Sequence, residues 1–261
     1  PTTLRFPHDV HMNPKGIESR TRVEVLECAS CHEAADTETG FKAVEMEAHC
    51  QSCHSLASEP ALPEREVPHG ASGPVLDTIV EFYSFLKQNP QMQADIARVR
   101  DTYLARPGAS NKPRASVKAN ALVQAEAAAQ DLFENRACAV CHQVSISDQP
   151  VTAQTSGSQL TQYTVADVAP THPWMPMARF DHKAHEFDSC ESCHKATTSD
   201  QAEDVLMPSL EGCQTCHSGS AGSLNKVESN CGVCHGYHIH DSNPPSGVPG
   251  QLSEETVAIR D

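Results

Sequence analysis

Apolar residues recur at helical spacing in two stretches near the middle of the chain. The first stretch has its apolar positions at Val75, Ile79, Phe82, Phe85 and Leu86. The second runs from Ser116 to Phe133 and is rich in Ala and Leu, which favour helices. Residues three and four apart share one face of a helix, so both patterns predict helices. We expect two or three helices over residues 67–137, serving as a structural arm or as an interface for a partner or a second copy.

The rest of the chain shows no helical run of this kind. Residues 145–170 are rich in Ser, Thr, Gln and Asp and predict a linker with short strands around residues 160–165. Beyond residue 240 the chain is rich in proline, which excludes a helix or a central strand. The hydrophobic fraction of 38% is low for the core of a 261-residue chain. We therefore expect a mostly irregular and α-helical fold with few strands and a core that contains cofactors.

All twelve cysteines fall in one pattern, Cys-x-x-Cys-His, which occurs six times. In c-type haem attachment, two such thiols bond the haem and the histidine binds its iron. Zinc ribbons also pair cysteines, but zinc does not require a histidine after every second cysteine. The sequence thus predicts six covalently attached haem c groups. The attaching residues are Cys28, Cys31, Cys50, Cys53, Cys138, Cys141, Cys190, Cys193, Cys213, Cys216, Cys231 and Cys234, and the iron-binding histidines are His32, His54, His142, His194, His217 and His235.

The motifs also suggest how the chain is divided. The segment Phe6-Pro-His8-Asp-Val-His11 precedes the first motif, and Phe180-Asp-His182-Lys-Ala-His185 precedes the fourth, so the chain contains an internal repeat. We expect two haem modules, the first interrupted by the helical insertion. The expected parts are residues 1–66 with haems 1 and 2, the insertion 67–137, the third haem and linker 138–170, the second trihaem module 171–240 and the proline-rich tail 241–261.

Nine of the fifteen histidines lie outside the motifs. If each iron binds two imidazoles, six of these nine serve as second ligands. The strongest candidates come from the repeat and are His8, His11, His182 and His185. His49 is the next candidate and competes with His69, while His238 or His240 is favoured over His172 for the remaining iron. With histidines in surplus, we assign no methionine ligand.

The pattern Phe-x-His-x-x-His followed by three Cys-x-x-Cys-His motifs resembles the class III multihaem cytochromes c. The similarity covers roughly residues 1–66 and 138–240. In that family the first histidine of the pair binds the first haem and the second binds a later one. The resemblance implies that His182 binds the haem of Cys190 and Cys193, and that His185 binds another haem of its module.

For the first module, the resemblance implies His8 as the ligand for the haem of Cys28 and Cys31, and His11 for another haem of that module. It also implies that His49, which shortly precedes the second motif, binds the haem of Cys138 and Cys141. The second module departs from the family because no histidine directly precedes Cys213.

Charge and hydropathy restrict the partners. The formal net charge of −15 comes without a basic patch, so we expect no nucleic-acid partner. No apolar run is long enough to span a membrane. Because c-type haem is attached outside the bacterial inner membrane, we expect an exported protein of the periplasm or cell exterior. The chain opens at Pro1-Thr-Thr without a signal peptide, which suggests a mature form.

Three functions fit these features. The favoured function is electron transfer between redox partner proteins, or to an extracellular acceptor, through haems that each bind two histidines. A homopolymer, in which a histidine of one chain binds a haem of the next, would resemble the polymerising extracellular multihaem cytochromes. A multihaem reductase for oxyanions would need one iron with an open coordination position.

Overall fold

The computed structural model describes residues 4–35, 41–104, 119–147, 156–168, 180–202, 204, 206–218 and 226–236. These residues belong to two compact units. Unit 1 comprises Pro1–Leu26, Glu45–His172 and Ala196–Val205, and unit 2 comprises Glu27–Val44, Pro173–Lys195 and Leu206–Asp261. The first motif therefore groups with the second trihaem segment, whereas contiguous parts were expected from the sequence.

The helices and strands are short except in the helical insertion. This confirms the expected fold, which is mostly irregular and α-helical. The helices are α1 (His8–His11), α2 (Ser72–Lys87), α3 (Pro90–Leu104), α4 (Ala121–Asp131), α5 (Cys138–Cys141), α6 (Cys190–Cys193), α7 (Leu210–Gln214) and α8 (Cys231–Cys234). The 3₁₀ and π turns are η1 (Cys28–Ser30), η2 (Met46–Cys50), η3 (Leu132–Arg136), η4 (Ser156–Gln159), η5 (Lys183–His185) and η6 (Ala196–Thr198). No helix in the described part is long and apolar enough to cross a membrane.

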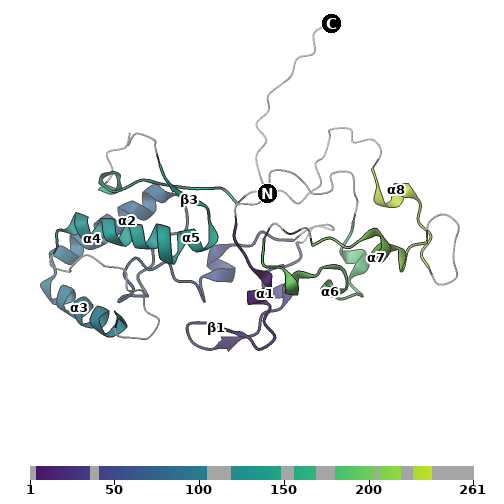
Figure 1. Ribbon diagram of the computed structural model, residues 1–261, viewed down its shortest axis with the longest axis horizontal. Coiled ribbons are helices and arrows are strands. Elements are labelled where there is room, and N and C mark those ends of the chain that lie inside the picture. The colour runs from purple at the N-terminus through teal and green to yellow at the C-terminus, as the bar shows by residue number, and fades with distance from the viewer. Residues whose placement is uncertain are drawn as a thin grey trace, which may run out of the picture. The chain divides into compact units, whose positions relative to one another are not determined.

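The core of unit 1 lies in the helical insertion. Helices α2 and α4 run side by side, and α3 also packs on α2 (Figure 1). The most deeply buried core residues are Leu76, Ile79, Leu86, Ile96, Ala125, Leu132 and Phe133. Two or three helices were expected here and three are present, although Phe85 is 46% exposed and does not share the buried face. The beginning of the second apolar stretch at Ser116 lies outside the described residues.

The helices begin where local chemistry favours it. The side chain of Asn120 accepts a hydrogen bond from the backbone N–H of Leu122 and caps α4. Pro90 occupies the first position of α3, where its missing N–H costs no helical hydrogen bond. Helix α4 continues into η3 and then α5, so the insertion leads directly into the third motif.

Two antiparallel sheets of two strands each are present among the described residues. In unit 1, β1 (Ile17–Glu18) pairs with β2 (Val23–Glu24). Strand β3 (Val144–Ile146) pairs with β4 (Tyr163–Val165), which confirms the short strands expected near residues 160–165. The ring of Tyr163 stacks on Phe133 at a centroid distance of 4.4 Å, so this second sheet packs on the helical core.

The loop after the second motif is attached to the same core. Glu59 is fully buried, where it accepts hydrogen bonds from the Tyr83 hydroxyl at 3.2 Å and from the Ala61 backbone N–H at 3.1 Å. Arg136 pairs with Asp131 at 3.0 Å and also donates to the Ala57 carbonyl. These bonds join the chain near the second motif to the helices that lead to the third.

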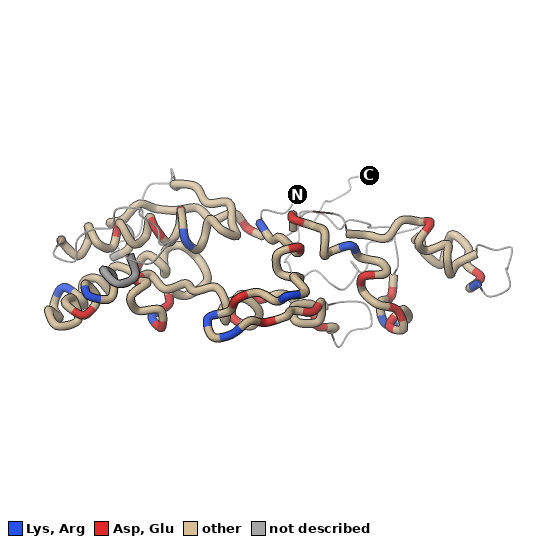
Figure 2. Tube along the Cα trace, turned by 60° about the horizontal axis from the view of Figure 1, so that its bottom comes forward, with Lys and Arg blue, Asp and Glu red and all other residues tan. Residues whose placement is uncertain are grey.

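Unit 2 is built differently. Its helices and turns in the described part are single turns, and none of its described residues is buried by other parts of the polypeptide. Figure 2 shows acidic residues along the described parts of the trace, with Lys and Arg between them. Among the described residues of unit 2, side-chain packing alone therefore forms no apolar core.

We expect Leu76→Ala to destabilise the helical core of unit 1 by about 2–5 kcal/mol, because Leu76 is fully buried and truncation leaves a cavity. The matched control is Val123→Ala in α4, where Val123 is 54% exposed and the expected change is below about 0.5 kcal/mol. Denaturant unfolding followed by far-ultraviolet circular dichroism measures both changes. Equal effects of the two substitutions would contradict this core.

Candidate haem-binding sites

The six motifs share one local geometry. In each, the backbone N–H of the histidine donates to the carbonyl of the first cysteine, at 2.8–2.9 Å. This bond closes a single helical turn, and residues three apart in such a turn lie on the same face. Both cysteines of a motif can therefore reach one cofactor while the histidine follows directly. All twelve cysteines are described, and none forms a disulfide.

Four motif histidines each face a second histidine from another part of the chain. Two pairs lie within unit 1 and two within unit 2. The pairs are His11 with His54, His69 with His142, His182 with His194 and His185 with His217, and their ring centres are 6.1, 6.0, 6.2 and 6.1 Å apart.

This spacing can be tested against metal ligation. An imidazole nitrogen binds a metal ion at about 2 Å, and the ring centre lies roughly 1 Å farther away. Two imidazoles on opposite sides of one metal ion therefore have ring centres about 6 Å apart. The four observed pairs agree with this separation, so their residues fit an iron that binds two histidines.

The rings in the repeat are also oriented for ligation. Nδ1 of His11 lies 2.8 Å from the Pro7 carbonyl oxygen, and Nδ1 of His185 lies 2.8 Å from that of Asp181. A carbonyl oxygen only accepts hydrogen bonds, so each Nδ1 carries the proton and donates it. Nε2 then keeps its lone pair for a metal ion, and the second nitrogen fixes the ring direction.

A comparison with known families agrees with this geometry. The family model for cytochrome c7 and related cytochrome c matches residues 178–236. This segment is similar to multihaem c-type cytochromes. It contains the last three motifs and both histidines of the second repeat. No curated protein and no solved structure matches the chain.

The match supports a multihaem c-type cytochrome whose haem is covalently bound, and cytochrome c7 proteins are electron carriers. Within the matched segment, the first histidine of the repeat, His182, pairs with the fourth motif. The second, His185, pairs with the fifth motif. In unit 1, His11 likewise pairs with the second motif of the chain.

The phenylalanine of each repeat has a role that the sequence analysis did not assign. Phe6 stacks on His11 at 4.3 Å, and Phe180 stacks on His185 at 4.5 Å. Each also lies 4.9 Å from the first histidine of its pair, in an edge-on arrangement. One aromatic ring thus orients both histidines of its repeat. The sequence offered a signal for this role, because a phenylalanine precedes the histidine pair in both repeats.

The third motif has a partner that differs from the one the resemblance implied. His69, not His49, lies beside His142. His69 lies shortly before α2 and His142 directly follows α5, so the helices between them fold back and bring these two residues together. Nδ1 of His69 also lies 4.0 Å from the Glu47 carboxylate. Nδ1 of His49 lies 3.0 Å from both the backbone nitrogen and the carbonyl oxygen of Glu45, within its own helical turn.

Of the remaining candidate second ligands, His8 lies in the described part of the chain. His8 lies edge-on to Phe6, and its role toward the haem of Cys28 and Cys31 stays a prediction. His172, His238 and His240 lie outside the described residues.

Burial keeps several of these groups neutral. It is the largest cause of the lowered pKa of His54, His142 and His182, with a smaller contribution from the facing histidine in each case. Neutral imidazole is the form that binds a metal ion. Burial also raises the pKa of the Cys138 thiol to about 11.

A separate polar cluster lies beside the second motif. The Glu66 carboxylate accepts hydrogen bonds from Arg20, from Gln51 at 2.5 Å and from Ser55 at 3.1 Å. Burial raises the pKa of Glu66, but the hydrogen bonds from Gln51, Arg20 and Ser55 outweigh it and the pKa is lowered overall. Because Gln51 lies inside the motif and Ser55 directly after it, this cluster holds the second motif to the β1–β2 hairpin region.

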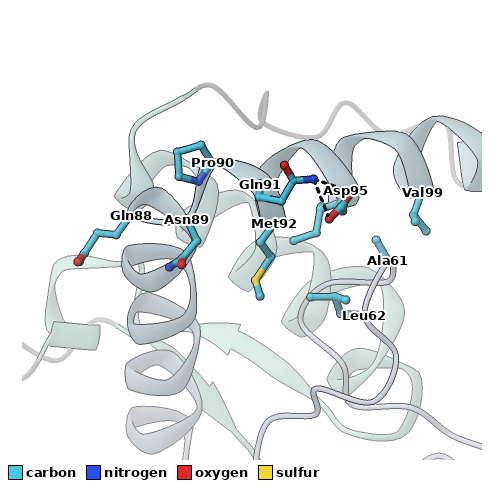
Figure 3. Close-up of a pocket in the computed structure, with 10 residues that line it drawn as sticks. Ala61, Leu62, Gln88, Asn89, Pro90, Gln91, Met92, Asp95 and Val99 are labelled. Atoms are coloured by element: carbon cyan, nitrogen blue, oxygen red, sulfur yellow. Dashed lines mark hydrogen bonds between the residues drawn. The ribbon is translucent and has the colours of Figure 1, made fainter.

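One cavity, of about 530 Å³, lies between the start of α3 and the loop at Leu62 (Figure 3). Its lining includes Met92, Asp95 and Val99 but neither cysteine nor histidine. Asp95 accepts a hydrogen bond from Gln91 at its edge. The cavity therefore offers no attachment or ligation site for haem.

We expect Glu66→Gln to reduce stability at pH 7 by about 1–2 kcal/mol, since it removes the charge that accepts three hydrogen bonds. The folded-state pKa of Glu66 is lowered, so its contribution is present above the unfolded value of about 4.3 and is lost as the pH falls through the folded value. The difference between wild type and variant should shrink as the pH falls from 7 to 3 in urea unfolding. The exposed neighbour Glu64→Gln is the control, and an equal loss of stability there would contradict the role of Glu66.

Proposed function

We propose that this protein is a hexahaem c-type cytochrome that relays electrons through closely spaced haems, each bound by two histidines, in the periplasm or outside the cell. The observation that carries the proposal is the set of four histidine pairs with ring centres 6.0–6.2 Å apart. The repetition of Cys-x-x-Cys-His in six places extends it to six haems.

The chain contributes attachment, ligation and placement. The two thiols of each motif would hold one haem, and the histidine that follows would bind its iron. When bound, haem iron accepts and releases single electrons. At the four motifs with a facing histidine, that residue would supply a second ligand and leave no position open to a substrate, which favours an electron carrier over an oxyanion reductase.

The second ligands follow from the pairs. His11 serves the haem of the second motif, His69 that of the third, His182 that of the fourth and His185 that of the fifth. For the first motif we keep His8. For the last motif the candidates remain His238 and His240, which are favoured over His172.

Unit 2 supports the proposal independently. None of its described residues is buried by polypeptide, yet it carries four of the six motifs. Haem is a large apolar plate, and covalently bound cofactors let a chain with few apolar side chains form a core. The haems would thus supply the apolar contacts that the described residues of unit 2 lack.

The test is the haem content and ligation of the holoprotein, made in a host that matures c-type cytochromes. Intact-mass spectrometry should show six covalently attached haems, and electron paramagnetic resonance of the oxidised protein should show six low-spin irons. Cryo-electron microscopy then identifies both ligands of each iron. A histidine donated by a neighbouring chain would instead indicate a filament subunit, and an iron lacking a second ligand beside a cavity would indicate a reductase.

His69→Ala should convert one haem to the high-spin form, because it removes the second ligand of the third haem while leaving the covalent attachment at Cys138 and Cys141 intact. Magnetic circular dichroism of the oxidised holoprotein measures the high-spin fraction, which should be one sixth. His69→Met is the matched variant, since a thioether restores six ligands and raises the potential of that haem. If His69→Ala leaves all haems low-spin, another residue is the ligand.

A further inference from the structure

Phe41 touches histidines from two different motif regions. Its ring lies edge-on to His32 at a centroid distance of 6.1 Å and edge-on to His182 at 5.0 Å. His32 completes the first motif, whereas His182 pairs with His194 of the fourth motif. All four residues belong to unit 2, so these contacts lie within one compact unit.

Local bonds hold Phe41 beside the first motif. Ala34 and Phe41 form an antiparallel bridge, and the backbone N–H of Lys42 donates to the Glu33 carbonyl at 2.8 Å. The Lys42 ammonium also pairs with the Glu33 carboxylate at 2.7 Å. The ring of Phe41 is therefore placed by the segment that follows His32, yet its nearer contact is with His182.

The first cysteines of the same two motifs also lie near each other. Burial is the largest cause of the raised pKa of the Cys28 thiol, and Cys190, the first cysteine of the fourth motif, raises it further. The contacts of Phe41 carry the connection between the first and fourth sites, and the nearness of these two cysteines agrees with it.

We propose that Phe41 is a shared positioning residue for the first and fourth haems, and that these two haems are direct neighbours in the electron relay. The inference rests on the proposed function, because it requires haems at both motifs. The proposal places the first haem beside the fourth, although the second and third motifs lie between them in the sequence.

The physical role of the ring follows from its geometry. An aromatic edge carries partial positive charge and prefers the face of another ring, so edge-on contacts fix relative orientation. His182 is held between two such rings, Phe41 at 5.0 Å and Phe180 at 4.9 Å, both edge-on. Loss of the Phe41 ring would free the imidazoles of both haems to turn, and imidazole orientation and surroundings affect the potential and the magnetic properties of the iron.

The experiment is Phe41→Leu in the loaded holoprotein, read by NMR of the haem methyl resonances assigned haem by haem, with potentiometric titration of the same haems. We expect the resonances and potentials of the first and fourth haems to shift together, while those of the other haems stay at their wild-type values. Phe187→Leu is the matched control, because Phe187 is 77% exposed and its ring touches His185 alone among the described histidines. It should shift the fifth haem only.

A shift confined to the first haem in Phe41→Leu would overturn the proposal, as would no shift at all. Phe41→Tyr keeps the ring and adds a hydroxyl, and it should also shift both haems if the leucine variant fails to mature. Wild-type protein without six low-spin haems would contradict the proposed function. Six low-spin haems with no joint shift would contradict only the role of Phe41.

Discussion

The structure depends above all on bringing two imidazoles to about 6 Å from each other, ring centre to ring centre. One imidazole of each pair is placed by a local helical turn of the Cys-x-x-Cys-His motif. The second imidazole of each pair comes from a separate segment of the chain and must be oriented separately. Backbone carbonyls at Nδ1 do this for His11 and His185, and a phenylalanine stacks on each ring. Burial lowers the pKa of several of these histidines and so favours the neutral, metal-binding form.

The two units meet this requirement with different means. Unit 1 has an ordinary apolar core in α2, α3 and α4, and that core brings His69 and His142 together from opposite ends of the insertion. The insertion is therefore part of a candidate haem site as well as a structural arm. Unit 2 has no buried residue among those described, so its single-turn helices are held by hydrogen bonds, ring contacts and, as we propose, by the haems themselves.

This arrangement has a consequence for electron transfer. A relay depends on which cofactors are neighbours in space, and in this chain neighbours in space come from distant segments. The Phe41 contacts connect the first motif to the fourth. Residues 27–44, which include Phe41 and the first motif, belong to the same unit as the fourth motif.

The sequence by itself determined the features that depend on nearby residues. These are the six attachment motifs, because thiols three residues apart lie on one face of a turn, and the helices of the insertion, because their apolar positions repeat every three or four residues. It also marked the repeat that contains His182 and His185. Only the tertiary structure decided which histidines meet the second, third and fifth motifs, since this depends on how loops and helices return through space. It placed His69 rather than His49 beside His142, and it placed Phe41 between two motif regions, because these contacts join residues with no common local pattern.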